Sequence, residues 1–185
     1  MPTSETTITS VSDGLFALAG VILGGVVTAG VTYFTEARRA RSARKVAARI
    51  LIDQLLLGGH KLHQIGSTGK WGFGSEAERQ RVLSDSHWLQ QRPLFAERLS
   101  SEDWGVVTAA FDWLARLSDN TKGLMPGDPA PFSEHGSSPW ETGFSLVLAA
   151  TNVLAPTAEN SPLTTEEIAR GYRQTDVQRV RIDPV

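Results

Sequence analysis

The chain has 185 residues, with 18 Lys and Arg against 20 Asp and Glu, and it contains no cysteine. The lack of cysteine excludes disulfides, thiolate nucleophiles and cysteine-based zinc sites, and it suits a reducing cytoplasm. The length allows one small folded domain in addition to an N-terminal segment.

The charge is unevenly distributed along the chain. Residues 36–65 hold seven basic and two acidic residues, whereas residues 66–185 hold 11 basic and 16 acidic residues. A mildly acidic domain is a poor match for the phosphate backbone of nucleic acid. We therefore expect no nucleic-acid partner.

The N-terminal region divides into a polar tail and an apolar segment. Residues 1–13 predict a flexible tail. Residues 14–34, GLFALAGVILGGVVTAGVTYF, contain no charged side chain. As a helix they would extend roughly 31 Å, about the thickness of the hydrocarbon core of a bilayer. This pattern predicts a transmembrane helix.

Basic residues follow the apolar segment, and none precede it. The positive-inside rule then places the N-terminus outside and the C-terminal part in the cytoplasm, which predicts a single-pass protein of the plasma (inner) membrane. The acidic N-terminus and the long apolar segment argue against a cleaved signal peptide. These basic residues surround the helix and are expected to contact anionic lipid headgroups: Arg38, Arg39, Arg41, Arg44, Lys45 and Arg49.

Small residues recur within the apolar segment. Gly20, Gly24 and Thr28 are spaced four apart and lie on one helical face. Small side chains let two helix backbones approach closely in lipid. We expect this face to form a helix–helix contact in the membrane and to make the protein a homodimer.

Residues 35–65 predict a basic juxtamembrane helix that becomes amphipathic. No Gly or Pro occurs between residues 35 and 57, so the helix should continue from the apolar segment up to Gly58 and Gly59. A packing seam with alternating spacings of four and three predicts contact with another helix, either of this chain or of a second copy. The seam contains Leu51, Leu55, Gly58, Leu62 and Ile65.

Residues 66–185 predict a small cytoplasmic helical domain. Four hydroxyl residues precede a carboxylate by three positions, the pattern of a capping box at a helix N-terminus. They are Ser75, Ser100, Ser138 and Thr164. Trp113 falls opposite the apolar stripe that follows Ser100, and it marks a candidate partner surface. Residues 119–137 hold three prolines and three glycines, which predict an irregular loop.

Motifs for chemistry are weak. The segment GSTGKWGFGS, residues 66–75, lacks the first glycine and the final Ser or Thr of a phosphate-binding loop. His60 and His63 could share a helical face, but too few further ligands are near them in the sequence for zinc. No G-x-S-x-G motif for a hydrolase occurs. We assign no catalytic residue, no metal ligand and no cofactor.

The fold class expected is all-α: one N-terminal transmembrane helix continuous with a cytoplasmic helix, plus a small helical bundle. The sequence resembles no family that would imply an activity. The function expected is a membrane-anchored, non-enzymatic module that presents a cytoplasmic surface to an unidentified protein partner, as an adaptor or regulatory subunit. The alternative is a membrane-tethered enzyme or small-ligand sensor with a site near loop 119–137.

Overall fold

The described part of the chain is helical. The computed structural model describes residues 6–130 and 139–169, in which helices are joined by turns and loops and no strand occurs. This confirms the all-α class. The elements are α1 (Thr6–Thr68), α2 (Glu76–Leu83), α3 (Ser86–Gln91), the 3₁₀ helix η1 (Arg92–Leu94), α4 (Ser101–Asn120), α5 (Pro139–Ala158) and α6 (Thr165–Ala169).

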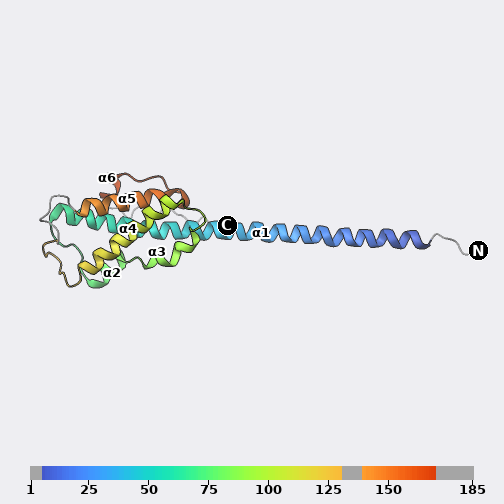
Figure 1. Cartoon of the computed structure of the whole chain (residues 1–185), viewed down its shortest axis with the longest axis horizontal. Coiled ribbons are helices and arrows are strands. Elements are labelled where there is room, and N and C mark those ends of the chain that lie inside the picture. The colour runs from blue at the N-terminus through green and yellow to red at the C-terminus, as the bar shows by residue number, and fades with distance from the viewer. Residues whose placement is uncertain (1–5, 131–138, 170–185) are drawn as a thin grey trace, which may run out of the picture. The chain divides into compact units, whose positions relative to one another are not determined.

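The structure divides into two compact units, residues 1–42 and 43–185. Helix α1 passes through both as one uninterrupted element, shown in blue to green in Figure 1. It begins at Thr6. The domain bounds drawn from the sequence stay predictions.

The predicted membrane location is contradicted. Among the residues that the structure describes, no helix contains an apolar stretch long enough to cross a bilayer. A spanning helix needs about 20 consecutive apolar residues. The predicted single-pass membrane location is therefore contradicted. The headgroup contact of the basic residues stays a prediction.

Hydroxyl N-caps begin three of the helices, and at α6 the Thr164 N–H also donates to the Glu167 carboxylate at 2.8 Å, which completes a capping box. At α2, the Ser75 hydroxyl accepts from the backbone N–H of Glu78 at 3.1 Å. At α4, Ser100 accepts from the backbone N–H of Asp103 at 3.0 Å. At α6, the Thr164 hydroxyl accepts from the backbone N–H of Glu167 at 3.3 Å. These predicted caps are confirmed, whereas Ser138 lies outside the described residues.

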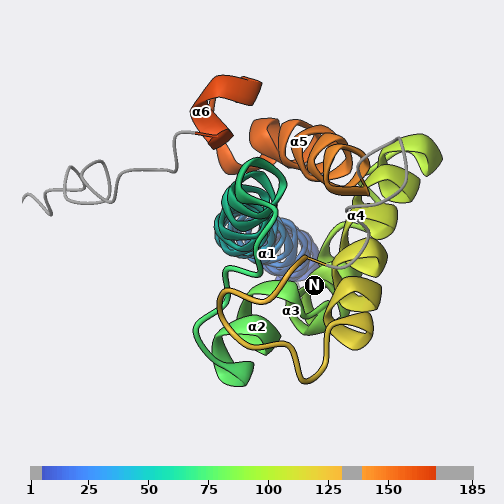
Figure 2. The same ribbon diagram turned by 90° about the vertical axis from the view of Figure 1, so that its left-hand side faces the viewer.

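The second unit is a bundle around the C-terminal part of α1. Figure 2 shows α4 and α5 side by side on one side of α1, with α6 beside α5 and with α2 and α3 on another side. Close contacts from three helices reach glycines of α1. A Cβ at Gly58 would lie 3.4 Å from Leu114 of α4, and one at Gly59 would lie 3.0 Å from Val147 of α5 and 2.9 Å from Ile168 of α6.

Helix α1 runs through Gly58 and Gly59, which lie within the helix that the sequence predicts over residues 35–65. Both glycines are buried and lie where other helices approach most closely, so packing compensates for their low helix propensity. The helix ends at Thr68. Gly69 follows with φ of 66°, a left-handed conformation typical of the residue after a helix, and its N–H donates to the Ile65 carbonyl at 2.8 Å.

An aromatic cluster forms the part of the bundle core where α3 packs against α4. Trp88 of α3 is fully buried and stacks on Phe111 of α4, with ring centroids 5.9 Å apart and planes inclined by 7°. Trp104 and Phe95 contact the same indole at centroid distances of 5.0 and 6.3 Å. The short α3 is therefore held to α4 by aromatic packing.

Glycine substitutions should test how closely α4 and α5 pack. A Cβ at Gly143 of α5 would lie 2.3 Å from the Trp113 ring of α4, so Gly143→Ala must displace the indole. We expect a loss of about 1–3 kcal/mol in the free energy of unfolding, measured with urea. Gly105→Ala in α4 is the control, because open space surrounds it, and it should gain about 0.5–1 kcal/mol. Equal effects would show that the two helices are not in close contact.

Candidate functional site

The second unit leaves one line of α1 uncovered. Val46, Ile50, Asp53 and Leu57 are exposed and follow spacings of four, three and four, so they lie on one side of the helix. We call these four residues the open face. Leu57 is 52% exposed, and all three apolar members are large side chains. Apolar side chains aligned in this way form a typical contact surface for a second helix.

Both edges of the open face are held by contacts to other elements. On one edge, Lys45 pairs with Glu159 and the Arg49 Nε donates to the Ala158 carbonyl at 3.4 Å, both at the C-terminal end of α5. On the other edge, the Gln54 side-chain amide donates to the Ser84 carbonyl after α2. The open face is therefore part of a fixed surface.

Asp53 is the one charged member of the open face. Desolvation by the surrounding residues raises the pKa of this carboxyl above its usual range, and the nearby Arg49 guanidinium opposes the shift. The ionised carboxylate is thus less favourable here than in water. A cation brought against Asp53 would stabilise the charged form.

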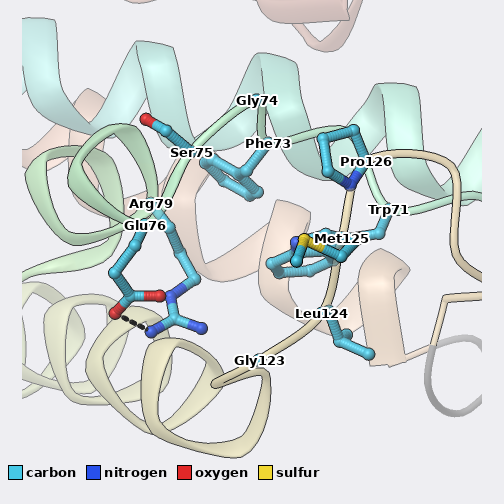
Figure 3. Close-up of a pocket in the computed structure, with 10 residues that line it drawn as sticks. All are labelled: Trp71, Phe73, Gly74, Ser75, Glu76, Arg79, Gly123, Leu124, Met125 and Pro126. Carbon is cyan, nitrogen blue, oxygen red and sulfur yellow. Dashed lines mark hydrogen bonds and ion pairs between the residues drawn. The ribbon is translucent and has the colours of Figure 1, made fainter.

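A second feature is a pocket of about 170 Å³ on another side of the same unit (Figure 3). It lies between the connection from α1 to α2 and the turn after α4. Figure 3 shows the Arg79–Glu76 pair on one side and Trp71 with Met125 on the other. Its walls are thus aromatic and apolar, with one guanidinium and one carboxylate.

Backbone pairing fixes the two segments that form the pocket. The Trp71 N–H donates to the Asp128 carbonyl at 2.7 Å, and the Gly127 N–H donates back to the Trp71 carbonyl at 2.9 Å. Lys61 of α1 fixes the same connection, because its Nζ donates to the Gly72 carbonyl at 2.9 Å and lies 3.0 Å from a carboxylate oxygen of Glu78. The pocket is therefore formed before any ligand binds.

Arg79 is the buried charge of this pocket. It is 2% exposed, its Nη1 donates to the Thr121 carbonyl at 2.5 Å, and its Nη2 pairs with Glu76. The Nε is buried and has no hydrogen-bond partner among the described residues. A buried donor without an acceptor is costly, so such a group often marks a site for a further ligand.

The structure places most of the residues singled out from the sequence away from these two features. The seam residues Leu51, Leu55, Leu62 and Ile65 are fully buried inside the second unit. The seam therefore packs against helices of this chain. The His63 ring lies 6.0 Å from that of Phe144, and the buried Nδ1 of His60 has no hydrogen-bond partner among the described residues.

The remaining predicted positions are divided between the two units. Arg38, Arg39 and Arg41 are exposed in the first unit, and Arg44 is half-buried in the second. Gly24 has open space around it, Thr28 donates to the Gly24 carbonyl at 2.8 Å, and the surroundings of Gly20 lie outside the described residues. The homodimer contact stays a prediction. Trp113 is half-buried over Gly143, and its role as a partner surface also stays a prediction.

Sequence reasoning missed both the open face and Arg79. Val46, Ile50 and Leu57 have the required spacing, but Asp53 interrupts the apolar pattern and the buried seam beside it is stronger. Arg79 sits in a short, charged helix, and nothing in the pattern of residues 76–83 signals burial. The predicted loop 119–137 does contribute to the pocket through Gly123 to Pro126, while residues 131–138 lie outside the described residues.

No family model, curated protein or solved structure is significantly similar to this chain.

Protonation of Glu78 in acid should lower the stability of the connection that forms one wall of the pocket. This carboxylate accepts from the Gly74 N–H at 2.8 Å and pairs with Lys61, and both contacts lower its pKa. A lowered pKa gives stability that is present above the ordinary glutamate pKa and is lost as the pH falls through the folded-state value. Glu78→Gln should therefore be less stable than wild type at neutral pH, and the difference should shrink in acid, as measured by urea unfolding. Glu97→Gln, at an exposed turn, is the control and should leave the pH dependence unchanged.

Proposed function

We propose that this chain is a non-enzymatic helical module that binds a partner protein through the open face of α1, as an adaptor or regulatory subunit. The observation that carries the proposal is the line of exposed large apolar side chains on the part of α1 from Val46 to Leu57, where most of the other residues are buried. Burying a Val, Leu or Ile side chain contributes about 1.5–3 kcal/mol. Three such residues on a fixed surface support binding without a large conformational cost.

Asp53 indicates the chemistry of the partner. A purely apolar helix would bury this carboxylate without compensation, which is costly. A partner helix with apolar residues at matching positions and a Lys or Arg opposite Asp53 would bury the apolar side chains and neutralise the charge. We therefore propose an amphipathic partner helix with a basic residue within its apolar stripe.

Charge substitutions on the open face should separate binding from folding. Ile50→Lys and Leu57→Lys place a cation in the proposed contact and should abolish stoichiometric co-purification of the partner, while circular dichroism stays that of wild type. Leu89→Lys is the matched control, because Leu89 is 48% exposed on α3, away from the open face, and this variant should retain the partner. Retention of the partner by both open-face variants would contradict the proposal.

The pH dependence of binding should report the basic residue opposite Asp53. Since desolvation raises the pKa of Asp53 in the free protein and a cation would lower it in the complex, binding releases a proton. Affinity should fall as the pH is lowered through the raised pKa, by at most about tenfold per pH unit, the limit for one linked proton. Asp53→Asn should remove this dependence. Stronger binding in acid would instead indicate a contact that buries Asp53 without a cation, as between two copies of this chain.

A further inference from the structure

We propose that the Arg79 pocket binds a small organic carboxylate whose apolar body is one aromatic ring or a branched aliphatic group. This site is separate from the open face, and the inference does not depend on the proposed partner. It accords with the alternative expectation of a small-ligand site near residues 119–137.

The Nε and Nη2 atoms of the Arg79 guanidinium form an edge whose hydrogen-bond donors match the two oxygens of a carboxylate. Nη1 is already bound to the Thr121 carbonyl, whereas Nε has no partner among the described residues and Nη2 pairs with a single oxygen of Glu76. Carboxylates bind Arg through two parallel hydrogen bonds, and the Nε–Nη2 edge presents such a pair. A ligand carboxylate on this edge would complete the hydrogen bonding of a buried side chain.

The walls select an apolar body of limited size. Trp71 and Phe73 are themselves fixed, with ring centroids 4.9 Å apart, and the exposed Met125 lies at the mouth, 68% exposed. Methionine adapts to irregular apolar shapes and packs favourably on aromatic rings. A cavity of about 170 Å³ is close to the size that holds one benzene-like ring.

Glu76 occupies the place that the ligand would take. Its side chain is 52% exposed and lies in the first turn of α2, where it also accepts from the Gln80 amide at 2.9 Å. A half-exposed carboxylate pays little to return to water. Glu76 is thus an internal competitor, displaced when a ligand carboxylate binds Arg79.

Binding of phenylacetate to the full chain tests the proposal. Titration followed by amide and indole NMR signals should show shifts concentrated at Trp71, Arg79 and Met125. Phenylacetamide has the same shape without the charge and should bind at least about tenfold more weakly, because it loses the charge-assisted hydrogen bonds to the guanidinium. N-acetylphenylalanine, a mimic of a peptide C-terminus, distinguishes the source: tighter binding than phenylacetate points to a peptide end, and weaker binding points to a free acid.

Two variants test whether phenylacetate binds at the Nε–Nη2 edge of Arg79. Glu76→Gln removes the competing charge and should tighten phenylacetate binding by about two- to fivefold, without affecting phenylacetamide. Met125→Glu places a negative charge at the mouth and should weaken phenylacetate binding. Neither position is in the core, so the fold should persist in both. Equal affinity for acid and amide, shifts outside the pocket, or no binding at millimolar concentration would overturn the proposal.

Discussion

The second unit depends on the close approach of other helices to the glycines of α1. At Gly59 a methyl group would already be within 3.0 Å of both α5 and α6, so the helix axes can come this near only because no side chain intervenes. Gly66 has the same role toward Trp140, whose Cβ lies 3.4 Å from where a Cβ would be. Close approach brings the backbones and the surrounding side chains into dispersion contact over several turns. The remaining helices are arranged around this central contact.

The two candidate binding features follow from how α1 is surrounded. Helices α4, α5 and α6 bury one broad side of it, and the connection containing Gly72 approaches its flank through Lys61. The line from Val46 to Leu57 is what these elements leave uncovered. The pocket lies on the far side of that connection, where it meets the turn at residues 123–126. Surface and pocket thus share one scaffold but use different residues.

Much of the fold could be predicted from local patterns, because helix caps and apolar stripes depend on residues that are close together in the sequence. Ser75, Ser100 and Thr164 mark helix starts since their hydroxyls satisfy backbone N–H groups within the same turn. The burial of Gly58 and Gly59 could not be predicted, because it depends on helices far along the chain. Arg79 was missed for the same reason: its acceptor, the Thr121 carbonyl, lies 42 residues away in the sequence. The membrane location was an inference from apolar length and flanking charge, and the described helices do not support it.

The distance in sequence between α1 and its partners has a consequence for synthesis on the ribosome. Gly59 packs against Val147 and Ile168, which are made roughly 90 and 110 residues later, or about 5–20 s at ordinary elongation rates. During that interval α2 to α4 can pack against α1, but the side of α1 at Gly59 lacks α5 and α6, although α1 itself forms within microseconds. The nascent chain therefore carries a partly uncovered apolar helix until α5 leaves the exit tunnel. Such an interval favours capture by a chaperone, and it makes completion of α5 the event that commits the domain to its fold.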